Sequence, residues 1–191
     1  MGVVFTYDKL FIVLLLKFRN ISKKNHTTSF VILGHTKSGP YTIHQPSGVV
    51  TTIYDASTKY KNDQVPLLVI AGENFGRGAA RDWATKGPYL LGVRAILALG
   101  FNPVYRNNMI KTGLLPVQID SETYNILCGE ELFELQVDLE NDSKDVLIVL
   151  NEGQTVLKAV HLLNNSYEIE VFKSGGILRQ SLNGFLKSPS S

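Results

Sequence analysis

The residues with the clearest chemical potential form a glycine-rich stretch, residues 72–78, here called the glycine loop, and the three residues that follow it. Glycine allows the backbone to adopt conformations, and to approach a ligand, where a Cβ atom would interfere. If a helix begins directly after the loop, its free N–H groups and its dipole favour an anion. Arg81 adds a planar guanidinium that suits a carboxylate. The candidate ligand-binding residues are Gly78, Ala79, Ala80 and Arg81.

A plainer interpretation is a tight connection between a strand and a helix, with Arg81 as a surface residue. Glycine-rich connections are common, and this one is neither a phosphate-binding P-loop nor a dinucleotide fingerprint. The residues alone leave both interpretations open. Arg77, inside the glycine loop, is the best candidate for a surface contact with a ligand or a partner.

Strands and helices are expected to alternate on both sides of the glycine loop. We expect strands at 67–71, 92–99 and 114–119, and helices at 51–62, 79–86 and 102–111. Trp83 is expected to pack the second of these helices against the sheet. Further strands are expected at 133–137, 145–149 and 156–160, and a closing helix at 177–187. This order predicts an α/β layer with parallel strands, followed by a β-rich C-terminal part.

Length, charge and cysteine content limit the kind of protein. A chain of 191 residues fits one domain, and a net charge of +2 is too mild to indicate a nucleic-acid or membrane surface. Cys128 is the single cysteine, which excludes an intramolecular disulfide and a cysteine-based metal framework. His161 shows no metal-ligand spacing and is expected to lie in solvent.

The N-terminal region carries an unbroken apolar run at residues 10–16. The run is far shorter than the roughly 20 residues that a membrane-spanning helix needs, and no basic start or cleavage site accompanies it. We therefore expect a cytoplasmic protein with no membrane partner. The run is expected to pack on the domain as a strand or helix edge, or to drive self-association.

The segment at residues 71–95 resembles the signature of swivelling C-terminal domains of the aconitase family. Its run Arg-Asp-Trp-Ala-Thr-Lys-Gly-Pro, which begins at Arg81, is similar to the bacterial and cytosolic branch, including iron-regulatory proteins. Segments at 39–48, 52–57, 113–116, 129–133 and 172–178 resemble the same branch, in the same order. The resemblance implies a swivelling β/β/α domain at 18–187, with a diverged arm at 1–17 and a tail at 188–191.

The resemblance also implies a function for the longer proteins of this family. They interconvert citrate and isocitrate in the tricarboxylic acid cycle, using a [4Fe-4S] cluster that three cysteines outside this domain hold. The expected partners are therefore citrate or isocitrate and, for the iron-regulatory type, an RNA hairpin. No cofactor is expected on this chain, because one cysteine cannot hold such a cluster.

Three departures from the family pattern bear on activity. Ala79 stands where the family has the serine that acts as catalytic base, and Leu15 stands where it has an arginine for a substrate carboxylate. The family's Phe-Glu-Arg-Ile-His-Arg-x-Asn is replaced at residues 101–108 by Phe-Asn-Pro-Val-Tyr-Arg-Asn-Asn, which loses the histidine and one basic residue. The departures predict that the chain has no intact catalytic residue and is inactive alone.

Three functional interpretations follow from the sequence. The first is the swivelling domain of an aconitate hydratase, either a fragment or an impaired paralogue. The second is a chain like the small subunit of isopropylmalate isomerase, against which the block at residues 82–87 argues. The third is an RNA-binding or regulatory relic of an iron-regulatory protein, for which a net charge of +2 offers little support.

Overall fold

The computed structural model describes residues 5–6, 11–13, 41–78, 81–127, 131–140 and 143–187. Its strands are β1 (Phe5–Thr6), β2 (Phe11–Val13), β3 (Tyr41–His44), β4 (Val49–Thr52), β5 (Leu67–Ala71), β6 (Val93–Ala98), β7 (Leu115–Gln118), β8 (Leu132–Val137), β9 (Asp145–Leu150) and β10 (Thr155–His161). Its α-helices are α1 (Ile53–Asn62), α2 (Trp83–Leu90), α3 (Pro103–Thr112), α4 (Ser121–Ile126), α5 (Ser166–Lys173) and α6 (Ile177–Lys187). The mixed α/β composition confirms the predicted class.

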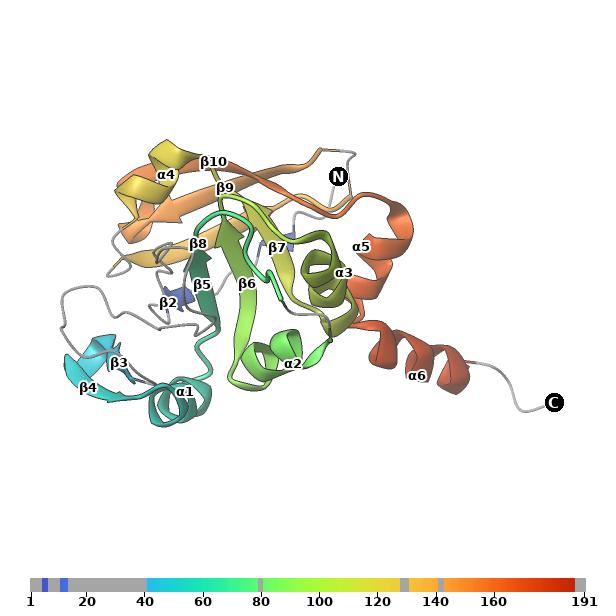
Figure 1. Ribbon diagram of the computed structural model, residues 1–191, viewed down its shortest axis with the longest axis horizontal. Coiled ribbons are helices and arrows are strands. Elements are labelled where there is room, and N and C mark those ends of the chain that lie inside the picture. Colours follow the sequence, from blue (N-terminus) through green and yellow to red (C-terminus); the bar gives the residue numbers. More distant parts are fainter. Residues whose placement is uncertain are drawn as a thin grey trace.

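The main sheet curls until its two ends meet. Its strand order is β1-β8-β2-β5-β6-β7-β10-β9, and a further antiparallel pairing joins β8 to β9. The three strands β5, β6 and β7 are parallel to one another, as predicted, whereas β8, β9 and β10 pair antiparallel. A separate hairpin of β3 and β4 lies beside α1 at one end of the molecule (Figure 1).

Two apolar cores lie on opposite faces of the parallel strands. Leu68 and Ile70 of β5 face the interior of the curled sheet, where they pack with residues of the antiparallel strands. Leu67 and Val69, one position out of phase, pack with residues of α1 and α3 on the outer face. Because successive side chains of a strand point to opposite faces, all five residues of β5 are buried. The layers are therefore antiparallel sheet, parallel sheet and helices, which is the predicted β/β/α arrangement.

Local capping explains where several helices begin. The side chains of Thr52, Asn102, Asp120 and Asn165 each accept a hydrogen bond from a backbone N–H in the first turn of α1, α3, α4 and α5. On α1, the buried residues Ile53, Ala56 and Tyr60 form the predicted inner face. Among the described residues, no helix is long and apolar enough to span a membrane.

Two glycine motifs meet where α3 ends. Gly113 has φ +88°, and a Cβ there would lie 2.8 Å from the carbonyl carbon of Gly175. Gly176 has φ +106°, and a Cβ there would lie 2.7 Å from the carbonyl oxygen of Lys111. The backbones after α3 and α5 can therefore approach this closely only with glycine on both sides. From this contact α6 extends away from the domain (Figure 1).

The N-terminal apolar run contributes one strand, β2, to the main sheet, although it was expected to pack at an edge. β2 pairs in parallel with β5 and antiparallel with β8, and β1 continues along the same edge of β8. β2 thus lies between two strands of the main sheet and not at its edge.

Deletion of residues 1–16 is nevertheless expected to leave a cooperatively folded domain. Five residue pairs still join β8 to β9, and the sheet remains continuous through β10 to β5. The loss of the β2 pairing exposes one edge of β5, so the midpoint of thermal unfolding should fall. Circular dichroism during heating measures both outcomes, and a truncated chain without a cooperative transition would contradict the prediction.

His161 is buried, with 2% of its surface exposed, so its predicted position in solvent is wrong. Its Nδ1 accepts a hydrogen bond from the N–H of Leu163 at 3.3 Å, and its Nε2 has no hydrogen-bond partner among the described residues. Burial lowers the pKa of His161, with a smaller lowering effect of Lys144 and opposing effects of Asp145 and the backbone of Ser143. A protonated Nδ1 could no longer accept the hydrogen bond from the N–H of Leu163, because both groups would then be donors.

We therefore expect the free energy of unfolding to decrease as the pH falls below about 6.5, the ordinary pKa of histidine. The pKa of His161 is lower in the folded state, so the unfolded state binds more protons in this range. Urea unfolding at pH 7.5 and pH 5.5 measures the difference. His161→Gln should reduce this difference, and an unchanged difference in that variant would contradict the assignment.

Candidate functional site

The glycine loop leaves the carboxyl end of β5 and is pinned to the connection between β6 and α3. The N–H of Phe75 donates to the carbonyl of Gly100, and the N–H of Asn102 donates to the carbonyl of Phe75, both at 2.8 Å. These bonds form a parallel bridge between Phe75 and Phe101 beyond the end of the sheet. Because the carboxyl ends of parallel strands share one edge, the glycine loop lies where ligands bind in open α/β sheets.

Gly76 and Gly78 both have a left-handed backbone, with φ of +84° and +90°, a conformation that favours glycine. Their surroundings differ. A Cβ on Gly76 would lie 2.1 Å from Cγ of Tyr105, whereas a Cβ on Gly78 would meet nothing within 4 Å. Phe75 stands edge-on to the ring of Tyr105, with the ring centroids 5.2 Å apart. The loop therefore packs on α3 at Gly76 and is open at Gly78.

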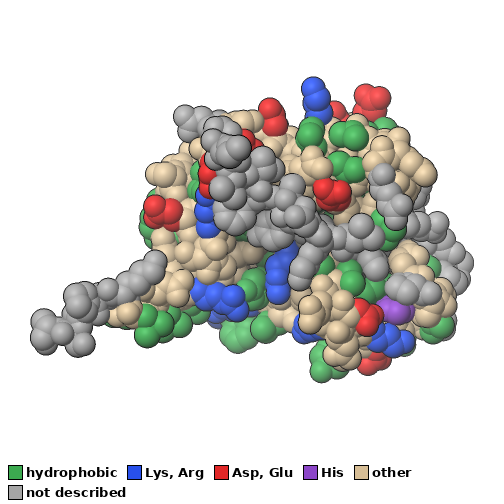
Figure 2. All heavy atoms as spheres, turned by 180° about the vertical axis from the view of Figure 1, so that it is seen from behind, with side chains coloured by type: hydrophobic (Ala, Val, Ile, Leu, Met, Phe, Trp, Pro, Cys, Tyr) green, Lys and Arg blue, Asp and Glu red, His purple; other side chains and the backbone are tan. Residues whose placement is uncertain are grey.

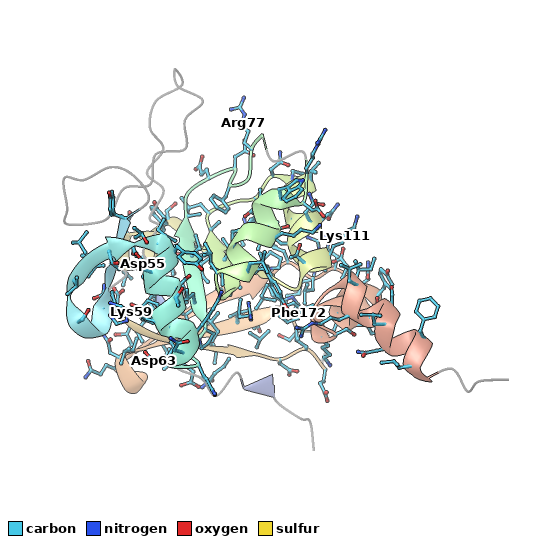
Figure 3. The ribbon with its side chains drawn as sticks, turned by 90° about the horizontal axis from the view of Figure 1, so that it is seen from below. Asp55, Lys59, Asp63, Arg77, Lys111 and Phe172 are labelled. Atoms are coloured by element: carbon cyan, nitrogen blue, oxygen red, sulfur yellow. The ribbon has the colours of Figure 1, made fainter. Side chains whose placement is uncertain are left out.

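Both arginines of the predicted site are exposed. Arg77 projects away from the domain at the outer edge of the loop (Figure 3). Arg81 lies in a bend just before α2, and no hydrogen bond or ion pair joins it to another residue of the described ranges. Gly78 is exposed beside them. Ala79 and Ala80, the other two predicted ligand-binding residues, lie outside the described residues, as do Leu15 and Cys128.

The helix after the loop begins later than predicted, at Trp83 and not at residue 79. The chain turns at Asp82, whose carbonyl accepts the N–H groups of Thr85 and Lys86 at 3.0 and 2.9 Å. Residues 81 and 82 form a bend and a turn outside the helix. Arg81 therefore precedes the helix start and does not lie within its first turn.

Trp83 does not pack α2 against the sheet, which corrects the prediction, because 74% of its surface is exposed. The Lys86 ammonium lies 5.9 Å from the centroid of its ring and forms an ion pair with Asp82 at 2.7 Å. A hydrogen bond from Lys86 holds the pKa of Asp82 below its usual range. The start of α2 thus presents an exposed aromatic ring and a neutralised acid.

A shallow hollow of about 440 Å³ opens on the same edge of the sheet. Its lining comes from the start of the glycine loop, from the chain at the ends of β6 and β7, and from residues 158–160 of β10. The charged residues in the lining are Glu73, Asp120 and Lys158. With two acids and one lysine, the lining of the hollow does not favour a multiply charged anion.

Two residues that sequence reasoning missed hold this region in place. Tyr105 is 3% exposed, and it occupies the position of the family's histidine in the segment 101–108. Arg106 is also buried and bonds to Glu168 and to the carbonyl of Leu162. The sequence does mark both residues, since the segment 101–108 departs from the family pattern. Its meaning depends on contacts with residues far away in the sequence.

The site is a glycine loop at the carboxyl edge of a parallel sheet, with an arginine just before the following helix. It defines an α/β domain that presents a cationic loop at its surface. A sequence profile of the aconitase C-terminal domain matches residues 15–122. The chain therefore belongs to the aconitase C-terminal domain family, as its resemblance predicted.

Two much longer proteins are similar in sequence to this chain. Aconitate hydratase A of Bacillus subtilis is 36% identical over 178 residues, which are 89% of this chain and 19% of that protein. Iron-responsive element-binding protein 2 of Xenopus laevis is 38% identical over 148 residues, which are 74% of this chain and 15% of that protein. The chain thus spans about a fifth or less of the length of these relatives.

A solved structure of 3-isopropylmalate dehydratase from Methanocaldococcus jannaschii superposes loosely on the domain. The TM-score is 0.49 at 21% sequence identity, over 71% of this chain and 80% of that one.

Proposed function

We propose that this domain acts as the swivelling C-terminal part of an aconitate hydratase-type assembly, in which Arg81 binds a carboxylate of citrate or isocitrate. The observation that carries the proposal is the glycine loop, pinned by Phe75 to the β6–α3 connection, which leaves Arg81 exposed and unpaired among the described residues. An unpaired guanidinium can give both of its parallel donors to a carboxylate. The relatives' names support the substrate class.

The chemistry of such an assembly would be divided between this domain and a cluster-bearing part. The chain has one cysteine, Cys128, and within its described part no group of three His, Cys, Asp or Glu side chains could hold a metal ion. These residues do not fit a [4Fe-4S] cluster, which needs several thiolates. In this proposal the domain contributes binding and orientation of the substrate.

The missing catalytic base is the second element of the proposal. The methyl side chain of Ala79 can neither take up a proton nor donate a hydrogen bond, so proton removal from the substrate carbon is absent. We expect the isolated chain to give no cluster absorbance after anaerobic reconstitution and no hydration of cis-aconitate. A cluster spectrum together with measurable turnover would contradict this prediction.

A chimaera tests substrate binding and the missing base separately. This domain would replace the matching fifth of Bacillus subtilis aconitate hydratase A. The chimaera should be inactive, and Ala79→Ser should raise its turnover by at least about 100-fold, the usual contribution of a positioned base. Arg81→Lys added to the serine variant should raise KM, because an ammonium cannot bind a carboxylate through two parallel donors. A serine variant that remains inactive while the cluster is intact would count against the proposal.

One observation favours RNA binding as a second function. Trp83 is exposed at the start of α2, with Lys86 over its ring and Arg81 two residues before it. An exposed ring among cations can stack on an unpaired base. Against this, a net charge of +2 gives little attraction to a polyanion. The opposite face of the molecule, seen from behind in Figure 2, carries interspersed acidic and basic side chains. Titration of a hairpin RNA at two salt concentrations tests the idea, and Trp83→Ala should weaken any binding that exists.

A further inference from the structure

We propose that Tyr105 is a positioning residue that links the glycine loop to α2 and so positions Arg81, which lies between the two contacts in the sequence. One side chain makes both contacts. Its ring contacts the loop at Gly76, and its hydroxyl contacts α2 at Ala84. The assignment of carboxylate binding to Arg81 rests on the proposed function, but the locking contact does not.

The ring end of Tyr105 defines the position of the loop. The absence of a Cβ on Gly76 lets the backbone lie directly on the Cβ and Cγ atoms of Tyr105. Aromatic packing adds to this contact, since the rings of Phe75 and Tyr105 pack edge to face with their centroids 5.2 Å apart. The backbone bonds of Phe75 then tie the loop to the same connection from which α3 begins.

The hydroxyl end of Tyr105 compensates for a defect in α2. Pro88 lies inside the helix and has no N–H, so the carbonyl four residues earlier, that of Ala84, lacks its normal helical donor. The hydroxyl of Tyr105 donates to this carbonyl at 3.3 Å. Burial raises the pKa of Tyr105 to about 12, so the hydroxyl keeps its proton at physiological pH. Tyr105 therefore supplies the hydrogen-bond donor that Pro88 lacks.

Tyr105 can act in this way because α3 is itself fixed. Asn102 caps the helix through the N–H groups of Val104 and Tyr105, at 3.1 and 3.4 Å. The next residue, Arg106, is bonded to the chain before α5. A second contact joins the two helices, since the hydroxyl oxygens of Thr85 and Thr112 lie 2.8 Å apart. The phenol thus projects from a rigid element, as a positioning group must.

The family's histidine at this position would make only half of the contact. The atoms nearest to Gly76 are the Cβ and Cγ of Tyr105, which any aromatic residue supplies. The atom that reaches Ala84 is the phenol oxygen, which lies beyond the reach of an imidazole on the same Cα. Tyr105→His is therefore expected to behave like Tyr105→Phe, keeping the loop contact and losing the contact with α2.

A double-mutant cycle on the full, ligand-free chain tests the lock. Hydrogen exchange of the backbone amides of α2, followed by mass spectrometry, is the readout. Tyr105→Phe should speed exchange in α2 about five-fold, the change expected for one net hydrogen bond. In a Pro88→Ala background, the same substitution should change exchange by less than about two-fold, because the new N–H can already bind the Ala84 carbonyl. Tyr54→Phe, on the exposed face of α1, is the control and should change nothing.

The possible outcomes separate this inference from the proposed function. Unchanged exchange in Tyr105→Phe, or an equal effect of Tyr105→Phe with proline and with alanine at position 88, would overturn the lock, since a tyrosine that only fills space is indifferent to residue 88. The same measurement with citrate added to wild type addresses the site. Absence of protection around Arg81 would count against carboxylate binding by the isolated domain and would leave the ligand-free cycle unaffected.

Discussion

Replacement of Gly76 with alanine is expected to lower the free energy of unfolding by about 3 kcal/mol, from left-handed backbone strain and overpacking together. The new methyl group would lie 2.1 Å from Cγ of Tyr105, a separation at which one of the two groups must move. Tyr105 is 3% exposed and cannot swing aside without opening the outer core. Chemical denaturation gives the free energy, and the alanine variant should also lose any binding through Arg81, because the loop must shift.

Gly78→Ala provides the matched control for this prediction. Gly78 lies in the same loop with a similar φ, +90°, but a Cβ there meets nothing within 4 Å. Gly78→Ala should therefore lower the free energy of unfolding only by the backbone strain, about 1–2 kcal/mol. The difference between the two variants isolates the contact with Tyr105. Equal destabilisation of the two variants would show that the loop does not rest on α3 as described.

Replacement of Arg106 with leucine is expected to destabilise the domain by about 3 kcal/mol at neutral pH, the range for removing one partner of a buried ion pair. The guanidinium donates to Oε1 of Glu168 at 2.7 Å and, through Nε, to the carbonyl of Leu162 at 2.8 Å. Both groups would be left without these donors in a largely buried position. This contact joins α3 to the start of α5, so its loss should loosen the C-terminal helices from the sheet.

The pH dependence of the same variant distinguishes the ion pair from simple packing. Burial alone would raise the pKa of Glu168, but hydrogen bonds from Arg106 and from the N–H of Asn164 hold it below its usual range. A carboxyl whose pKa is lowered on folding contributes stability above its unfolded pKa and loses it as the pH falls. Arg106→Leu should therefore flatten the decline in stability below about pH 4.5.

Lys86→Ala is the control for the ion-pair prediction. Lys86 and Asp82 also form an ion pair, at 2.7 Å, but both side chains are nearly half exposed. Exposed pairs contribute at most about 1 kcal/mol. Unfolding by urea compares the two variants directly. If Arg106→Leu were no more destabilising than Lys86→Ala, burial of the first pair would have no energetic consequence.

The elements whose signals are local were predictable from the sequence. The face of α1 with Ile53, Ala56 and Tyr60 follows from helical spacing, and the buried strand β5 follows from an unbroken apolar run. Asn165 marks the beginning of α5 because an asparagine side chain can bind the N–H groups of a first helical turn. The family motifs rest on the same kind of information, which is residue type in fixed order, and they identified the family.

The start of α2 and the surroundings of Trp83 were not predictable in this way. Helical spacing fits residues 79–86 as well as the observed Trp83–Leu90. The glycine loop before the helix is held by the hydrogen bonding of Phe75 to Gly100 and Asn102, which joins segments about 25 positions apart. Such pairing leaves no periodic trace in either segment. Burial of His161 is similar, since it depends on how β10 meets the segment before β9.

By itself, the sequence determined the class of domain, the order of elements from α1 to β7 and from β8 to β10, and the place of the glycine loop. Only the tertiary structure decided that the sheet closes through β8 and β9, that Tyr105 bridges Gly76 and Ala84, and that Arg106 pairs with Glu168. The physical reason is the range of the interactions. Propensity, capping and periodicity act within a few residues, whereas burial and pairing depend on which distant residues the fold brings together.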